Sequence, residues 1–389
     1  MERYRIAAIP GDGVGPEVLD AGRRVLDAVG GRAGFAIQWQ EIVAGGAGID
    51  AYGAAIREED VTVCAEADAV YLGAVGGPKW DDPDASVRPE QALFVLRGGL
   101  DLYANLRPVS VEPSLVRSSP LRPELLEGVD IVIVRELTGG LYFGQRQEGS
   151  QERGARAAHD TLPYTEQQIE RVVRAAFELA RGRRRQLTSV DKANVLATSR
   201  LWRKIVEEVA TDFPGVTFEH RLVDAAAMML IKRPASFDVI VTENVFGDIL
   251  SDEASVLAGS LGMLPSASLG TRRTAHGTFG LYEPIHGSAP HLAGQDRANP
   301  IGTILSGAML LRWSLGREAE AAAIEGAVRR ALEDGLRTSD LARDDPRSEG
   351  GELQVVGTRA FAEAVVHRLT FEPPRHPTAA PQPEAEAIR

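Results

Sequence analysis

Short apolar runs alternate with amphipathic segments along most of this chain. The first run, Tyr4–Ile9, is followed by a glycine-rich turn and a helical pattern over Pro16–Val29. Later runs typical of strands are Val70–Leu72, Ile131–Val134, Leu187–Val190 and Val239–Val241. A capping box formed by Thr165 and Gln168 predicts a helix over Thr165–Ala180, which Gly182 would end. Such alternation predicts an α/β fold with substantial parallel sheet.

Size and charge exclude several classes of protein. The 389 residues predict about two domains, and the net charge of −12 leaves no basic excess to drive binding of nucleic acid. Because no signal peptide or membrane-spanning run is evident, we expect a cytoplasmic protein without a membrane partner. The single cysteine, Cys64, excludes an internal disulfide and is expected to be buried and inert. The basic run 181–185 is expected to cap a helix and stay solvated.

The segment 238–262 carries the clearest chemical signal. Asp248 and Asp252 lie four residues apart, so on a helix they share one face and repel each other unless a cation lies between them. Such oxygen ligands suit Mg²⁺, whereas a solvated acidic face is the simpler explanation of an isolated pair. Here the neighbours are apolar, which favours a metal site on a partly buried helix; they are Ile249, Leu250, Val256 and Leu257.

Arginines end three apolar runs. Arg97 ends ALFVLR, Arg107 lies in LYANLRP, and Arg135 ends IVIVR. At the end of a strand, an arginine can extend its planar guanidinium into a cleft and bind a carboxylate through two hydrogen bonds. For each one alone a structural ion pair is the simpler role. Three in an acidic protein favour a site for a small polycarboxylate.

Three further side chains are candidates for proton transfer or ligand binding. Tyr142 lies among glycines in TGGLYFG, where backbone can approach a ligand, although packing is the usual role of a loop tyrosine. Lys192 follows a strand, and apolar surroundings would lower its pKa and allow it to act as a base. Asp224 lies at a strand-to-helix junction, where capping the helix is the alternative.

Two glycine-containing loops are candidate ligand sites. The turn PGDGVGPE at 10–17 joins a strand to a helix, but its spacing matches neither the dinucleotide fingerprint nor a P-loop, so a tight turn and a ligand loop remain equally open. The missing lysine and hydroxyl also argue against an NTPase. The segment 286–300, HGSAPHLAGQDRANP, is rich in small residues that let backbone N–H groups approach a ligand.

In combination, these segments resemble the β-decarboxylating dehydrogenases of the isocitrate/isopropylmalate type. The motifs that carry the resemblance are PGDGVGPE, GGPKW, LYANLRP, VRELTGGLYFG, VDKANVL, FGDILSDEAS and EPIHGSAP. The resemblance implies an isopropylmalate dehydrogenase-like two-domain α/β fold that is not a Rossmann fold, with mixed sheets and flanking helices. It implies a first domain of residues 1–106 and 266–372, and a second of 107–265 that contains the interface of a homodimer. Composition predicts a disordered proline-rich tail over 373–389.

The resemblance also implies roles for individual residues. Asp248 and Asp252 would hold Mg²⁺ or Mn²⁺ together with Asp224 of the partner subunit, which would also contact the substrate. The three arginines would bind the carboxylates of a malate-type substrate. Lys192, also from the partner subunit, would be the general base and Tyr142 the general acid. The residues implied in cofactor binding are Val14, Glu90, Asn105, Leu261, Gly262, Glu283, His286, Gly287, Ser288, Ala289, His291 and Asn299.

Two departures from the family pattern bear on specificity. Members that use NAD carry an aspartate where this chain has His291, so we expect NAD with relaxed selectivity against NADP. Phe94 stands where a smaller leucine is usual in the family, which indicates an altered side-chain pocket and keeps open a paralogue that acts on another 3-substituted malate. Leu93 and Phe94, with Val195 opposite, would form an apolar wall that accepts an alkyl group and rejects a third carboxylate. The leading expectation is therefore oxidative decarboxylation of 3-isopropylmalate in leucine synthesis. Alternatives are another 3-substituted malate, tartrate, homoisocitrate or isocitrate, and more remotely a paralogue that binds ligands without turnover.

Overall fold

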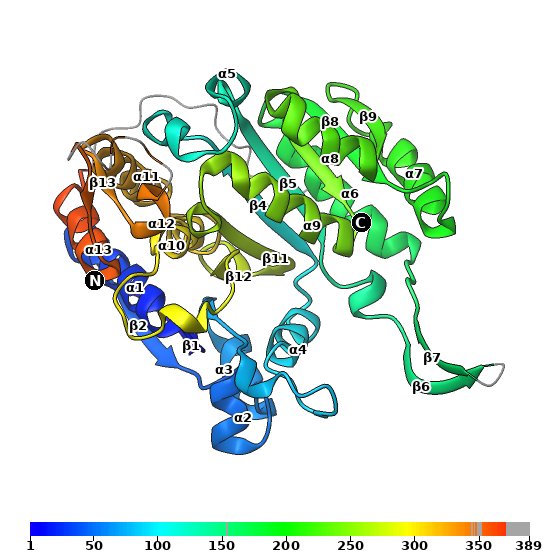
Figure 1. Ribbon diagram of the computed structural model, residues 1–389, viewed down its shortest axis with the longest axis horizontal. Coiled ribbons are helices and arrows are strands. Elements are labelled where there is room, and N and C mark those ends of the chain that lie inside the picture. The colour runs from blue at the N-terminus through cyan, green and yellow to red at the C-terminus, as the bar shows by residue number, and fades with distance from the viewer. Residues whose placement is uncertain (153–154, 344, 346, 348–351, 371–389) are drawn as a thin grey trace.

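The structure is a computed structural model that describes residues 1–152, 155–343, 345, 347 and 352–370. Within this part of the chain, ten strands form one mixed sheet in the order β2-β1-β3-β12-β11-β4-β5-β10-β8-β9 (Figure 1). These strands are β1 (Glu2–Gly11), β2 (Phe35–Glu41), β3 (Ala69–Ala74), β4 (Ala104–Ser110), β5 (Asp130–Glu136), β8 (Gln186–Asp191), β9 (Thr217–Leu222), β10 (Val239–Thr242), β11 (Pro265–Arg273) and β12 (Thr278–Pro284). The predicted α/β fold with a mixed sheet is confirmed.

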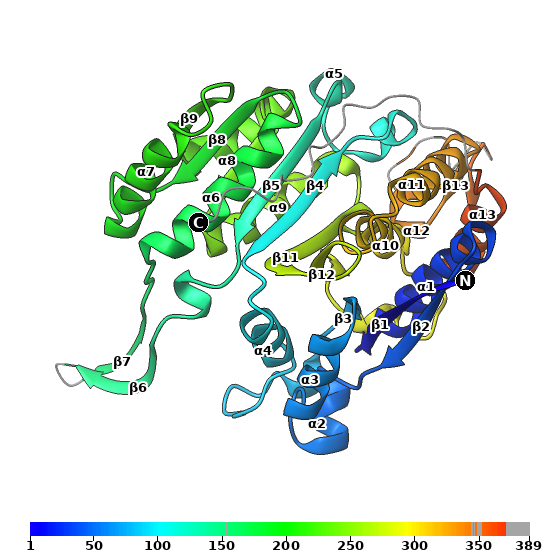
Figure 2. The ribbon, with the colours of Figure 1, turned by 180° about the vertical axis from the view of Figure 1, so that it is seen from behind.

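Helices pack against both halves of this sheet, as Figures 1 and 2 show from opposite sides. The α-helices are α1 (Gly15–Ala33), α2 (Gly46–Tyr52), α3 (Glu58–Glu66), α4 (Gln91–Gly99), α5 (Pro123–Leu126), α6 (Glu166–Arg181), α7 (Ala197–Ala210), α8 (Val223–Lys232), α9 (Asn244–Ser255), α10 (Ile301–Trp313), α11 (Glu318–Glu333), α12 (Ser339–Ala342) and α13 (Thr358–His367). The predicted capping box of Thr165 and Gln168 is present at the start of α6, and Gly182 follows its end. No helix in the described ranges is long and apolar enough to cross a membrane.

The sheet changes direction in its middle. Strands β2, β1, β3 and β12 run parallel to one another, and so do β5, β10, β8 and β9. Between these halves, β11 and β4 join their neighbours through antiparallel pairs. Both domain boundaries expected from the family fall inside strands of this antiparallel part, because residue 106 lies in β4 and residue 266 in β11.

Residues on alternate faces of β1 and β3 pack against different helices. Ile6 and Tyr71 belong to the large apolar core that includes α1 and α10, whereas Ala7 and Leu72 belong to a second core with α3 and α4. Strands covered on both faces are expected in parallel sheets. Two short pairs lie outside the main sheet: β13 (Leu336–Arg337) with β14 (Gln354–Val355), and a hairpin of β6 (Arg146–Glu152) and β7 (Ala155–Asp160) that projects from the body (Figure 1).

Several sequence expectations need correction or lie outside the described residues. Ile249 of α9 is 61% exposed, and Val256, directly after the helix, is 38% exposed, whereas Leu250 is buried, so only one face of α9 is buried. The basic run 181–185 is not simply solvated: Arg183 donates to the buried carboxylate of Asp238 at 2.8 Å and so ties the end of α6 to β10. The expected disordered tail, 373–389, lies outside the described residues.

Cys64 of α3 is buried in the second apolar core, as predicted, and burial raises the pKa of its thiol to about 12. The thiolate is the reactive form, so the native protein should react with a thiol reagent at pH 8 at least about 100-fold more slowly than the unfolded chain. The check is to time modification with and without denaturant. Equal rates would show that Cys64 is accessible.

Candidate active site

Sheet register places the polar side chains of four neighbouring strands on one face. Asn105 and Arg107 of β4 lie two residues apart, and Ser268 of β11 pairs with Asn105. Along β5, Arg135 lies two residues from the partner of Arg107 and therefore on the same face. Glu283 of β12 joins them because it pairs with Ser266, two residues from Ser268. Helix α9 packs on β4 and β5, which brings its carboxylates to this face.

Two buried guanidinium groups converge on Asp248. Arg135 donates a short hydrogen bond to its Oδ1, and Arg107 lies 3.3 Å from the same oxygen and 3.7 Å from Asp252. Burial lowers the pKa of both arginines. The charge of Arg97 lowers both pKa values further, and the charge of Arg107 also lowers that of Arg135. Burial would raise the pKa of Asp248, but the arginines outweigh it and keep that pKa below its usual value. Each guanidinium has further N–H donors, so the two arginines can also bind the carboxylates of a ligand.

The expected strand-end setting is wrong for two of the three arginines. Arg97 lies in helix α4, and Arg107 lies in the middle of β4, whereas Arg135 does lie next to the end of β5. Arg97 still reaches the same region, because its buried guanidinium pairs with Glu283 at 3.0 Å. All three arginines are therefore brought together, by the helix packing in the case of Arg97 and by sheet register for the others.

Tyr142 lies in a 3₁₀ turn, Gly140–Tyr142, and donates to Asp248 Oδ2 at 2.9 Å. Burial and the neighbouring Asp248 carboxylate raise the pKa of its hydroxyl, which keeps the proton on oxygen. The ring of Phe94 lies 6.1 Å from that of Tyr142, between centroids. Phe94 thus lines the candidate site, whereas Leu93 packs on the second apolar core and Val195 is exposed.

Lys192 and Asp224 form a second group within the chain. The Lys192 ammonium pairs with the Asp224 carboxylate, so the expectation of apolar surroundings for Lys192 is wrong in a single subunit. That ammonium lowers the pKa of Asp224. Asp224 is the second residue of α8, whose N-cap is Leu222, so the alternative that Asp224 caps this helix is wrong. Within the described residues no three His, Cys, Asp or Glu side chains gather to hold a metal, and Asp224 does not join Asp248 and Asp252 in one chain.

Several residues expected at the cofactor lie at the N-terminus of α1 and on the loop 286–300. The Val14 N–H donates to the Ser288 carbonyl at 2.8 Å, and Gly13 lies so close to Ser288 that a Cβ there would be 2.0 Å from the same oxygen. His286 contacts the Gly287 carbonyl through Nδ1, while its Nε2 is buried without a hydrogen-bond partner in the described structure. An unpaired buried nitrogen on this loop, next in the sequence to Gly287 with open space at its Cβ position, fits a polar ligand such as a dinucleotide.

The other expected cofactor residues lie on neighbouring elements. Gly262 follows Leu261 in a 3₁₀ turn, and a Cβ on Gly262 would be 2.7 Å from Asn299 Cβ. Glu90 precedes α4, with one oxygen 3.0 Å from the position of a Cβ on Gly76. Asn105 is buried and donates to the Ser266 and Ser268 hydroxyls at 2.9 and 3.1 Å. On the loop itself, Ala289 has a positive φ of 37° and His291 is exposed.

Asn244 and Asp12 position this site and were not found from the sequence. Asn244, buried at the start of α9, accepts from Arg135 Nε at 2.9 Å and donates to the Gly139 carbonyl at 2.9 Å. It therefore connects Arg135 to the turn that carries Tyr142. The Asp12 carboxylate accepts from the N–H groups of Gly46, Ala47 and Gly76 at 2.8 Å. The available signal was position: a polar side chain directly after an apolar strand, as in PGD and VTEN.

Comparison with known proteins identifies the family of this chain. A profile described as isocitrate/isopropylmalate dehydrogenase matches residues 5–365. The chain belongs to this family. A 3-isopropylmalate dehydrogenase of Geobacillus kaustophilus is 58% identical over 365 residues, covering 94% of this chain and 95% of the relative. One from Anaeromyxobacter dehalogenans is 56% identical over 365 residues, with coverage of 94% and 99%.

Solved structures agree with this assignment. An isocitrate dehydrogenase from Methylococcus capsulatus superposes with a TM-score of 0.81 at 35% identity, covering 94% of this chain and 99% of that one. A β-decarboxylating dehydrogenase from Thermococcus kodakarensis gives 0.73 at 38% identity, with coverage of 94% and 96%. This member of the isocitrate/isopropylmalate dehydrogenase family is an enzyme of the β-decarboxylating dehydrogenase type.

Proposed function

We propose that this enzyme converts 3-isopropylmalate and NAD⁺ to 4-methyl-2-oxopentanoate, CO₂ and NADH, and requires Mg²⁺ or Mn²⁺. The observation that carries the proposal is the convergence of Arg107 and Arg135 on Asp248, with Tyr142 donating to the same carboxylate. The names of the relatives at 58% and 56% identity support 3-isopropylmalate as the substrate. Another 3-substituted malate is the second candidate, because Phe94 packs directly on Tyr142 and would shape the side-chain pocket.

In this scheme, Arg97, Arg107 and Arg135 bind and orient the two carboxylates of the malate. Lys192, as the neutral amine, accepts the proton of the 2-hydroxyl, and Tyr142 returns a proton to the carbon that has lost CO₂. A divalent cation held by Asp248 and Asp252 would supply Lewis acidity, and NAD⁺ would accept the hydride. Asp248 and Asp252 suit such a cation, because both present carboxylate oxygens with side chains 34% and 58% exposed.

We also propose that the active site is shared in a homodimer. Lys192 and Asp224 pair with each other instead of joining Asp248 and Asp252, so a second subunit would be needed to complete the site. Exposed apolar side chains support an interface on the segment 107–265: Met228 of α8 is 56% exposed and Ile249 of α9 is 61% exposed. We retain the division into a domain of 1–106 with 266–372 and a domain of 107–265 as part of this proposal.

A panel of malates with purified protein tests substrate and metal together. We expect reduction of NAD⁺ with 3-isopropylmalate and Mg²⁺, at a kcat/KM at least about tenfold above that with isocitrate, because the Phe94 wall would desolvate a third carboxylate. Exhaustive chelation should remove essentially all activity, and added Mg²⁺ or Mn²⁺ should restore it. Full turnover after chelation would contradict the metal requirement, and a better rate with another malate would replace the substrate.

Cofactor choice is tested in the same assay. Because His291 is exposed and replaces the family's aspartate, we propose NAD use with weak discrimination against NADP. A tenfold or greater preference for NADP would contradict this part of the proposal.

A further inference from the structure

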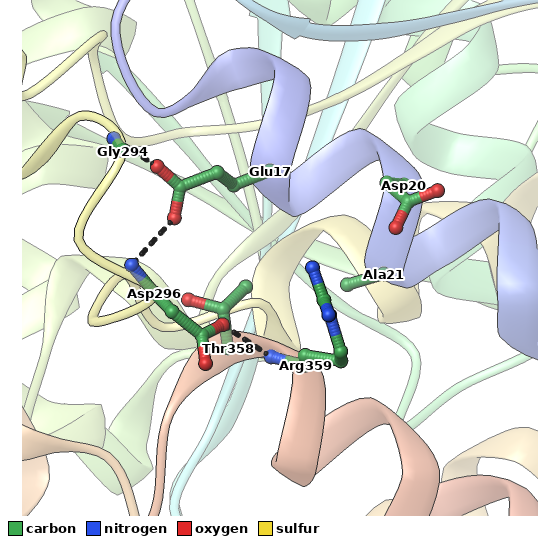
Figure 3. Close-up of a pocket in the computed structure, with 7 residues that line it drawn as sticks. All are labelled: Glu17, Asp20, Ala21, Gly294, Asp296, Thr358 and Arg359. Atoms are coloured by element: carbon green, nitrogen blue, oxygen red, sulfur yellow. Dashed lines mark hydrogen bonds between the residues drawn. The ribbon is translucent and has the colours of Figure 1, made fainter.

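A residue of α1 binds the backbone of the loop 286–300. Glu17 is the third residue of α1, and its carboxylate turns toward the loop (Figure 3). One oxygen accepts a short hydrogen bond from the Gly294 N–H, and the other accepts from the Asp296 N–H at 3.1 Å. Both oxygens of one side chain therefore accept hydrogen bonds from the same turn of the loop, residues 294–296.

Asp296 connects the loop to α13. Its Oδ1 accepts from the Arg359 N–H at 2.9 Å, and its carbonyl accepts from the Thr358 N–H at 3.2 Å. The N-cap of α13 is Gly357, which has no side chain to do this. A Cβ on Gly357 would lie 2.4 Å from the Asp296 carbonyl oxygen, so the close approach needs glycine.

The backbone of this part of the loop adopts conformations that need support. Gly294 has a φ of 73°, and Asp296 has a φ of 52°, in the left-handed region that side chains other than glycine rarely adopt. Ser288, nearer the start of the loop, is fixed by the Val14 N–H. The start of α1 thus holds the loop at two places: the N-cap residue Val14 binds Ser288, and Glu17 binds Gly294 and Asp296.

A simpler role for Glu17 is to stabilise the positive end of α1, as acidic residues of a first turn do. That role requires only a negative charge near the helix N-terminus. It does not require both oxygens to accept hydrogen bonds from another segment, and Asp20, one turn further along α1, pairs instead with Arg24 at 2.7 Å. The contacts of Glu17 are therefore specific to the loop.

We propose that Glu17 is a positioning residue for dinucleotide binding: it holds the 294–296 turn so that residues 286–291 are in place before the cofactor arrives. This inference rests on the proposed function, in which residues of this loop bind NAD. Preorganisation of a binding loop lowers the entropy that the ligand must remove on binding, so its loss weakens binding more than it slows chemistry.

The experiment compares Glu17→Ala with the matched control Asp20→Ala. Asp20 is an acidic residue of the same helix, and both side chains line a small pocket between α1, the loop and the start of α13 (Figure 3). Hydrogen exchange without cofactor should show the amides of Gly294 and Asp296 exchanging about tenfold faster in Glu17→Ala, the effect of losing roughly one charge-assisted hydrogen bond. The KM for NAD⁺ should rise by about tenfold, while kcat and the KM for the malate change less than about twofold. Glu17→Gln, which keeps one acceptor oxygen, should be intermediate.

The outcomes separate this inference from the proposed function. Unchanged exchange in Glu17→Ala, faster exchange with an unchanged KM for NAD⁺, or an equal effect of Asp20→Ala would overturn it. If the wild-type protein reduced no dinucleotide with any malate, the proposed function would fail, while the exchange measurement would still decide whether Glu17 holds the loop.

Discussion

Replacement of Lys192 by alanine is expected to lower kcat about a thousandfold, the scale of a lost general base. The side chain reaches a carboxylate already expected at the metal and substrate, because its ammonium pairs with Asp224. The neutral amine of the same side chain is the proposed proton acceptor, so without it the hydroxyl proton of the malate would have none. Binding of NADH, followed by its fluorescence, should be unchanged, because Lys192 is not among the residues that surround the loop 286–300.

Two controls make this result specific. Lys204→Ala removes an exposed lysine of α7 and should leave kcat within about twofold. Added ethylamine should restore part of the activity of Lys192→Ala if the missing group is a base. A kcat near that of the wild type in Lys192→Ala would remove its assignment as the base.

Replacement of Asp248 by asparagine is expected to have an effect of similar size, for a different reason. Asp248 is the common partner of Arg107, Arg135 and Tyr142 and a proposed metal ligand. Asparagine keeps the shape but removes the charge, so kcat/KM should fall about a thousandfold and the metal should bind at least tenfold more weakly. Calorimetric titration with Mg²⁺ and steady-state kinetics at saturating metal measure the two effects separately.

The same variant should also be less stable. Two buried guanidinium groups lose their shared negative charge, which should cost roughly 2 kcal/mol in the free energy of unfolding, less than for a fully buried pair because 34% of the Asp248 side chain is exposed. Glu253→Gln, on the same helix, is the matched control and should change neither property. Wild-type metal binding in Asp248→Asn would contradict its role as a ligand.

Mixing the two inactive variants tests the shared site. If Lys192 of one subunit serves the Asp248 site of the other, a mixed dimer of Lys192→Ala with Asp248→Asn contains one intact site. Random exchange of subunits should then restore about a quarter of wild-type activity. If both residues acted within one subunit, every site would lack one of them, and mixing would restore nothing.

The sequence by itself determined the elements with strong local signals. The capping box of Thr165 and Gln168, the apolar strands and the i, i+4 pair of Asp248 and Asp252 were predicted correctly, because each depends on neighbours within a few residues. The motifs were also enough to indicate the family, which the comparisons confirm. Local patterns failed for Arg97, since ALFVLR is a short apolar run that fits either a strand or the helix that it forms.

Only the tertiary structure decided how these residues meet. The antiparallel pairing of β4 with β5 puts Arg107 and Arg135 on one face, and helix packing brings Asp248 between them. It also decided the roles of Asn244 and Glu17, whose partners lie 109 and 277 residues away in the chain. Hydrogen bonds and charge pairs at such separations depend on chain topology, which no pattern of neighbouring residues encodes; the local sequence specifies the elements, and their packing creates the site.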